Sequence, residues 1–122
     1  MPPAVGFIKI LGATIDASIA YVDAATTGTF VVSVGSAVGA DDATLSGTEN
    51  DIIPETAIAG ASTPEVWHAY GRNVANGIFD GTSAALDLFV NVACPDASNS
   101  ATAQTYAITG TLTITWINLG TY

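Results

Sequence analysis

Residues 104–116 read QTYAITGTLTITW, and apolar and polar side chains alternate along this stretch. A β-strand turns successive side chains to opposite faces of a sheet, so a period of two predicts a strand with one apolar face and one threonine face. Glycine within such a run commonly marks a bulge or bend, and at Gly110 we expect the strand to pass from one sheet of a sandwich to the other. The apolar face contains Tyr106, Ile108, Leu112, Ile114 and Trp116, and the other face contains Thr105, Ala107, Thr109, Thr111, Thr113 and Thr115.

Shorter strand patterns recur toward the N-terminus, separated by turn residues. Residues 5–11 form an apolar run that ends at Gly12, residues 14–23 alternate, and residues 29–34 are nearly continuous in hydrophobicity. Residues 35–50 combine glycine, serine and acidic residues without a clean period, which predicts a long loop.

The second half of the chain adds further strands. Pro54 lacks one backbone donor, so the apolar pieces around it suit an edge strand. Residues 66–70 form another strand, and the Asn-Gly and Asp-Gly pairs within 72–83 predict tight turns around Ile78 and Phe79. We also expect a strand over 86–92 with a core face made of Leu86, Leu88, Val90 and Val92.

Seven or eight strands without a long helix favour an all-β fold. We expect an antiparallel β-sandwich of the jelly-roll type, because two sheets packed face to face bury the apolar side of each strand. A length of 122 residues fits one domain, residues 1–122, with residues 1–4 as a short N-terminal arm.

Charged residues are scarce and mostly acidic. They make up 11% of the chain, against roughly a quarter in typical soluble domains. Burying an unpaired charge is costly, whereas threonine and alanine are easily desolvated, so this composition suits a protein packed against neighbours. The net charge is −9, with Lys9 and Arg72 as the cations, which argues against binding to nucleic acid. The sequence contains no run of eighteen apolar residues, so no membrane-spanning helix is predicted. The N-terminus does not resemble a signal peptide, so we expect the protein to be made and used without Sec export.

The residues that usually carry catalysis are sparse. His68 is the only histidine and shares a strand face with Val66 and Tyr70, so we expect a hydrogen-bonded strand residue rather than a base or ligand. Cys94 is the only cysteine and is expected to be a small apolar residue at a strand end. We therefore expect no enzyme activity, no catalytic residues and no cofactor.

Two other groups of residues leave alternatives open. Asp41, Asp42, Glu49 and Asp51 lie close together in sequence and are either solvated loop acids or calcium ligands. Their spacing matches no EF-hand loop, so solvated acids are favoured and no metal site is predicted. Three aromatic residues could either form a platform for sugars or pack into the core: Trp67, Tyr70 and Trp116. Core packing is favoured because Trp116 continues the apolar register of its strand.

The order of several segments resembles small bacteriophage capsid decoration (cement) and minor head proteins of the jelly-roll type. The resemblance spans nearly the whole chain, and each segment is weak by itself. The segments are Ile10-Leu11-Gly12-Ala13, TFVVSVGS at 29–36, the acidic loop that follows, NDIIP at 50–54, LDLFVNVA at 86–93 and TGTLTITWI at 109–117.

This resemblance implies an adhesive function without catalytic residues. We expect a structural protein on the capsid exterior, assembled in the host cytoplasm, that binds the major capsid protein and itself as a homotrimer or else a dimer. The alternative is a receptor- or carbohydrate-binding module of a tail or fibre. Prolines lower the ordering cost of an extended segment, so the expected interface is the arm Pro2, Pro3, Ala4 and Val5, with an apolar anchor at Phe79.

Overall fold

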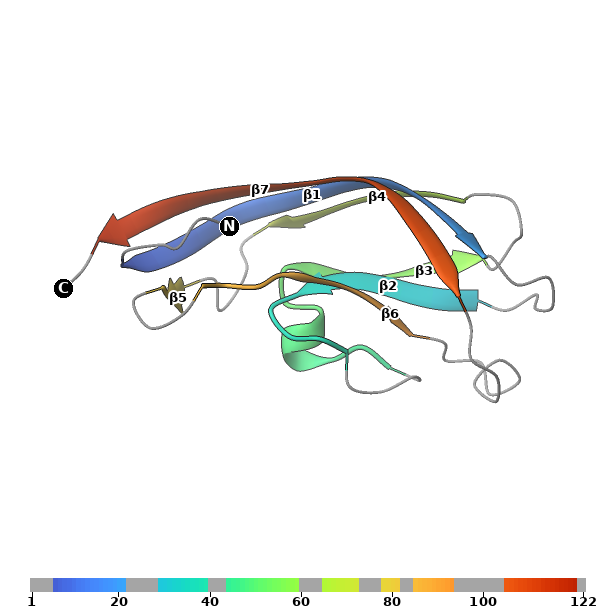
Figure 1. Ribbon diagram of the computed structural model, residues 1–122, viewed down its shortest axis with the longest axis horizontal. Coiled ribbons are helices and arrows are strands. Elements are labelled where there is room, and N and C mark those ends of the chain that lie inside the picture. Colours follow the sequence, from blue (N-terminus) through green and yellow to red (C-terminus); the bar gives the residue numbers. More distant parts are fainter. Residues whose placement is uncertain are drawn as a thin grey trace.

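The computed structural model describes residues 6–21, 29–39, 44–59, 65–72, 78–81, 85–93 and 105–120. Figure 1 shows two layers, with β1, β4 and β7 in one and β2, β3 and β6 in the other. The predicted all-β sandwich of two antiparallel sheets is confirmed, although the strand pairing does not specifically show a jelly roll. The elements in these ranges are β1 (Phe7–Tyr21), β2 (Thr29–Gly35), the 3-10 turn η1 (Gly47–Glu49), β3 (Ile53–Ala59), β4 (Glu65–Arg72), β5 (Ile78–Asp80), β6 (Phe89–Ala93) and β7 (Tyr106–Gly120).

Strand β1 is the centre of the first sheet, which we call sheet A. It pairs with β7 along its whole length, while β4 and β5 share its other edge. The second sheet, sheet B, has the order β3–β2–β6. All of these pairs are antiparallel.

A β-bulge explains why β1 reads as two pieces in the sequence. Ile10 lies opposite Trp116 and Gly12 lies opposite Thr115, so Leu11 is an extra residue on β1. An extra residue shifts the alternation by one position and lets both halves of a strand turn apolar side chains to the same side. The break predicted at Gly12 is therefore a bulge inside one continuous strand. The buried residues of β1 are Ile8 and Ile10 before the bulge, and Ala13, Ile15, Ala17 and Ile19 after it.

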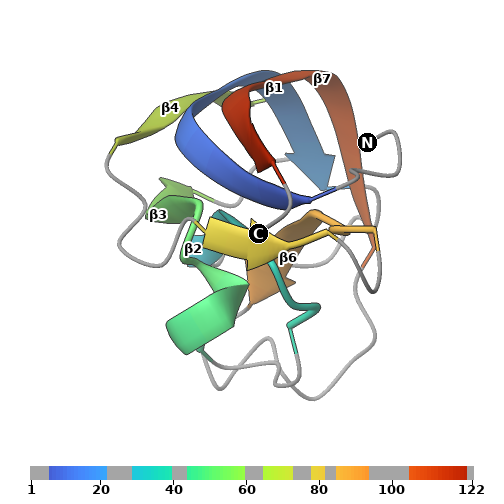
Figure 2. The same ribbon diagram turned by 90° about the vertical axis from the view of Figure 1, so that its left-hand side faces the viewer.

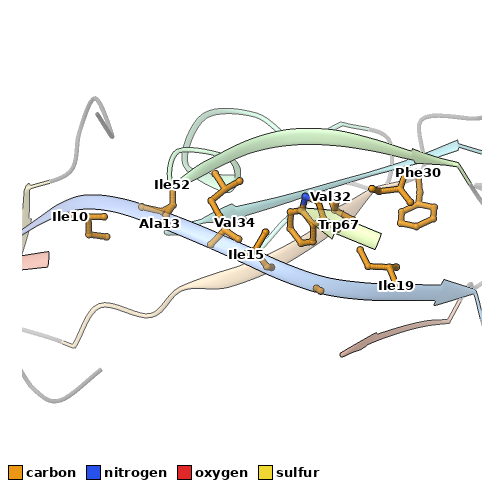
Figure 3. Packing of buried hydrophobic residues seen from close by; sticks show 12 residues of the cluster. Ile10, Ala13, Ile15, Ile19, Phe30, Val32, Val34, Ile52 and Trp67 are labelled. Atoms are coloured by element: carbon orange, nitrogen blue, oxygen red, sulfur yellow. The ribbon is translucent and has the colours of Figure 1, made fainter. Parts of the chain in front are cut away.

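The core lies between the two sheets. Figure 3 shows side chains of β1 directed toward Val32, Val34 and Trp67. Burying each large aliphatic side chain contributes about 1.5–3 kcal/mol, so this cluster is the main source of stability. Trp67 is 1% exposed, and its Nε1 has no hydrogen-bond partner among the described residues.

Gly110 does not have the role expected from the sequence. The pairing of β7 with β1 continues without a shift from Thr115 to Tyr106, and Gly110 lies opposite Ala17. The predicted passage between sheets is therefore wrong. A Cβ atom at Gly110 would collide with the carbonyl oxygen of Asp16 and the Cα atom of Ala17, so glycine allows close contact between the two strands.

The predicted core faces of β6 and β7 are correct in direction and only partly buried. Leu112 and Ile114 pack against the core, as do Leu86, Leu88 and Val92. Ile108 is 37% exposed and Val90 is 40% exposed, which corrects their assignment to the core. Both lie on strands at sheet edges, where one flanking strand is missing. Trp116 is half-buried.

Residues 36–51, described except for 40–43, cover the outer face of sheet B; we call them the cover segment. Figure 2 shows η1 on the side of sheet B that faces away from sheet A. Asn91 is 4% exposed and accepts a hydrogen bond from the Gly39 N–H at 2.9 Å. It also donates to the carbonyl oxygens of Ala37 at 2.9 Å and Glu49 at 2.8 Å. The predicted loop is thus tied to the sheet by a buried amide.

Candidate interaction surface

The candidate functional site is the outer face of sheet A, on the side away from the core. Alternation along β4, β1 and β7 turns every second side chain outward, and the strand register aligns these side chains in rows. Figure 2 shows no other described segment over this face. The rows are Tyr70–Thr14–Thr113, His68–Asp16–Thr111 and Val66–Ser18–Thr109.

The bulge in β1 shapes one end of this face. It places Leu11 on the outer side, where the side chain is 45% exposed. Leu11 and Tyr70 flank the backbone of two glycines, and a hollow of about 530 Å³ lies between them. The hollow is lined by Leu11, Gly12, Ala13, Thr14, Tyr70, Gly71, Thr113 and Thr115.

Exposed apolar side chains gather on this face. Eight large apolar residues of the described chain are exposed, and five of them belong to the outward register of sheet A. An exposed apolar concentration with a polar surround is typical of a binding surface. The five are Leu11, Val66, Tyr70, Ile78 and Ile117.

Charged side chains are few on this face: Asp16 and His68 form a pair in the middle row, and the exposed Lys9 lies between Ile78 and Ile117 toward the start of β1. The His68 Nδ1 atom lies 3.1 Å from the Asp16 Oδ1 atom, in the middle row. The side chains are 65% and 76% exposed, so solvent screens this pair and it adds little to stability. The prediction that His68 is a partnered strand residue is confirmed. Apart from Asp16, the residues on the same row and on the two adjacent rows are threonine, serine, tyrosine and valine.

The residues predicted to form the interface are placed as follows. Pro2, Pro3, Ala4 and Val5 lie outside the described residues. Phe79 lies on β5 opposite Ile8, and its half-buried side chain packs against the core cluster. Its neighbour Ile78 is exposed on the outer side of sheet A. A contact role for the arm and for Phe79 stays a prediction.

The three aromatic residues do not form a shared platform. Trp67 is buried, which confirms core packing, and Trp116 lies on the half-buried inward register opposite Ile10. Tyr70 is 66% exposed on the outer face. Alternation explains the separation, because Trp67 and Tyr70 are an odd number of residues apart on one strand.

The acidic residues of the cover segment have structural partners. Both carboxylate oxygens of Asp51 accept hydrogen bonds from Ser36, at 2.9 and 2.8 Å. A carboxylate oxygen of Glu49 accepts a bond from the Ser46 N–H at 2.9 Å. Asp41 and Asp42 lie outside the described residues. Within the described ranges, no group of three His, Cys, Asp or Glu side chains is placed to hold a metal ion.

The threonine face of β7 could be predicted from the sequence, whereas its alignment with outward residues of β1 and β4 and the apolar part of the surface were not predicted. In the sequence Leu11 is the last residue of an apolar run, and one sequence does not show which residue a bulge turns outward. The repeat Val66-x-His68-x-Tyr70 did carry the signal for an outward register on β4.

Comparison of the chain with family models, curated proteins and solved structures found no significant match. In the described part of the chain, no helix is long and apolar enough to cross a membrane.

Proposed function

We propose that this protein is a non-enzymatic structural protein of a phage virion that binds the outer surface of the capsid and stabilises contacts between major capsid subunits. The observation that carries this proposal is the outer face of sheet A, which no described segment covers and whose three central rows hold no charged group apart from the exposed Asp16–His68 pair. Threonine and exposed apolar side chains cost little to desolvate, so such a face is suited to contact with another protein.

The mechanism is thermodynamic linkage. A ligand that binds the assembled lattice, and not the dissociated subunits, stabilises the lattice by mass action. Capsid symmetry repeats the same weak contact many times, and self-association of this protein as a trimer or dimer links several contacts into one binding event. The protein then acts on the capsid exterior after assembly in the host cytoplasm.

The chemistry of the face favours a neutral contact over an ionic one. Asp16 and His68 already pair with each other within the central rows, and the residues around them are uncharged. Attachment through hydroxyl and apolar groups depends weakly on ionic strength. Raising the salt concentration should therefore leave most of the capsid attachment intact.

Co-sedimentation with undecorated capsids tests this proposal. Thr14 is exposed on the central strand of the outer face, and Thr14→Lys places a charge where the contact would be desolvated. Thr44→Lys is the matched control, because Thr44 is exposed on the cover segment. We expect capsid affinity to fall about tenfold or more for Thr14→Lys and to stay unchanged for Thr44→Lys. Equal binding by both variants would contradict the proposed contact surface.

A receptor- or carbohydrate-binding module of a tail or fibre is the second candidate. It is favoured by Tyr70, which is exposed beside the hollow of about 530 Å³, with threonine hydroxyls along the same wall. Aromatic rings stack on the apolar faces of sugars while hydroxyls supply hydrogen bonds. Binding of the isolated protein to a glycan array, lost in Tyr70→Ala, would favour this candidate. Sedimentation only with capsids would favour the first.

A further inference from the structure

Strand β7 is a long edge of sheet A that no described strand flanks on its outer side. It has 15 residues, none of them charged and none of them proline. Among the described strands it pairs with β1 alone. The edge of such a strand presents backbone N–H and C=O groups that can pair with another strand.

The edge strand β3 of sheet B shows the contrast within the same molecule. It has 7 residues and contains Pro54 and Glu55. A short strand, a proline and a charge each hinder pairing with another chain, and β3 combines all three.

We propose that the middle of β7, residues 107–117, pairs antiparallel with β7 of a second copy to form a two-fold dimer. Because each copy has a net charge of −9, two copies repel each other in most relative orientations. Strand β7 is a 15-residue edge without a carboxylate, so two copies meet there without placing acids opposite each other. A two-fold pairing is also closed, because each dimer uses both free edges.

The side-chain pattern of β7 fits this pairing. In an antiparallel pair that matches residues of like parity, threonines lie opposite threonines and apolar residues lie opposite apolar residues. The outer face of sheet A in one copy then continues into the outer face of sheet A in the other copy. On the other side, the exposed part of Ile108 gains an apolar neighbour.

Analytical ultracentrifugation of the free protein at micromolar concentration tests the inference. Thr111 is exposed on β7, and Thr111→Lys places like charges near the axis of the dimer. Thr14→Lys adds the same charge to the same face on the central strand β1. We expect a wild-type dimer whose dissociation constant rises about tenfold or more in Thr111→Lys and is unchanged in Thr14→Lys. A monomer, a trimer, or equal behaviour of the two variants would overturn it.

Disulfide cross-linking locates the pairing. In a Cys94→Ala background, single cysteines replace Thr109, Thr111, Thr113 or Thr115 in turn. A disulfide requires Cα atoms about 4.4–6.8 Å apart, so cross-linking should peak at the position nearest the two-fold axis and fall on either side. Thr14→Cys should give no cross-linked dimer, and a uniform yield across all positions would contradict the antiparallel pair. These measurements use no capsid, so they are independent of the proposed function.

Discussion

The outer faces of the two sheets differ in what covers them. The cover segment lies over sheet B, held by Asn91 and by the bonds between Ser36 and Asp51. No described segment lies over the outer face of sheet A, where five large apolar side chains are exposed. Among the described residues, one outer face is therefore covered by the chain itself and the other is open to solvent.

The two faces also differ in the kind of residue they use. Sheet B turns Ser33, Gly35 and Asn91 toward the cover segment, where each has a specific contact. A Cβ atom at Gly35 would collide with the backbone of Glu49 and Thr48, so glycine lets the segment lie directly on the strand. Sheet A turns repeated threonines outward instead. Substitutions on the two faces should therefore have very different effects on the free protein.

The largest effect should come from Asn91→Ala. This change leaves the Gly39 N–H and the carbonyl oxygens of Ala37 and Glu49 without their partner. Unsatisfied buried polar groups cost about 1–3 kcal/mol each, and partial access of water reduces the sum, so we expect a loss of about 2–4 kcal/mol. Denaturant unfolding measures it. A loss below about 0.5 kcal/mol would show that the cover segment is not tied down by this amide.

A smaller contrast is expected across the two sides of β7. Ile114 packs against the core and is half-buried, so Ile114→Ala should destabilise by about 2 kcal/mol, the lower end of the range for buried isoleucine. Thr113 is exposed on the opposite side, and Thr113→Ala should cost less than about 0.5 kcal/mol. Thermal and denaturant unfolding of both variants test the register, and similar losses would contradict it.

The strand alternation of β7 could be predicted because a period of two is a local property. The threonines at 109, 111, 113 and 115 are exposed, and Leu112 and Ile114 pack against the core, as the sequence indicates. Pro54 likewise lies in an edge strand, because a missing backbone donor is visible in the sequence itself. The sandwich follows from such local patterns.

The extent of burial could not be predicted, because it depends on the neighbours of each strand. Val90 and Ile108 have the expected direction and remain exposed, since edge strands lack a second flank. The role of Gly110 and the bulge at Leu11 could not be predicted for a related reason. A glycine marks either an irregular strand or a close contact, and only the paired strand decides which.

Deletion of the N-terminal arm tests whether the arm adds to capsid attachment. Residues 1–4 precede β1, so deleting Met1 to Ala4 should leave the free energy of unfolding unchanged. If the arm adds contacts to those of the outer face, capsid affinity should fall about three- to tenfold, which corresponds to about 1 kcal/mol. Retained copies on undecorated capsids, counted at low and high salt, measure this. Undiminished binding, or binding abolished by modest salt, would contradict the neutral contact proposed here.

The smallest effect should come from the exposed contact between His68 and Asp16 on the outer face of sheet A. His68→Ala should change stability by less than about 0.5 kcal/mol, because the partners are 65% and 76% exposed. Asp16→Asn serves as the reciprocal variant. A loss above about 1 kcal/mol at either position, measured by denaturant unfolding, would show that this face contributes to the fold rather than standing free for a partner.

Cryo-electron microscopy of the particle that contains this protein is the most direct test of the central claim. We expect density for the sandwich on the exterior of the shell, with Thr14, Tyr70 and Thr113 facing major capsid subunits and the cover segment facing solvent. Density with the cover segment against the shell, or a position on the tail or away from any virion, would contradict it.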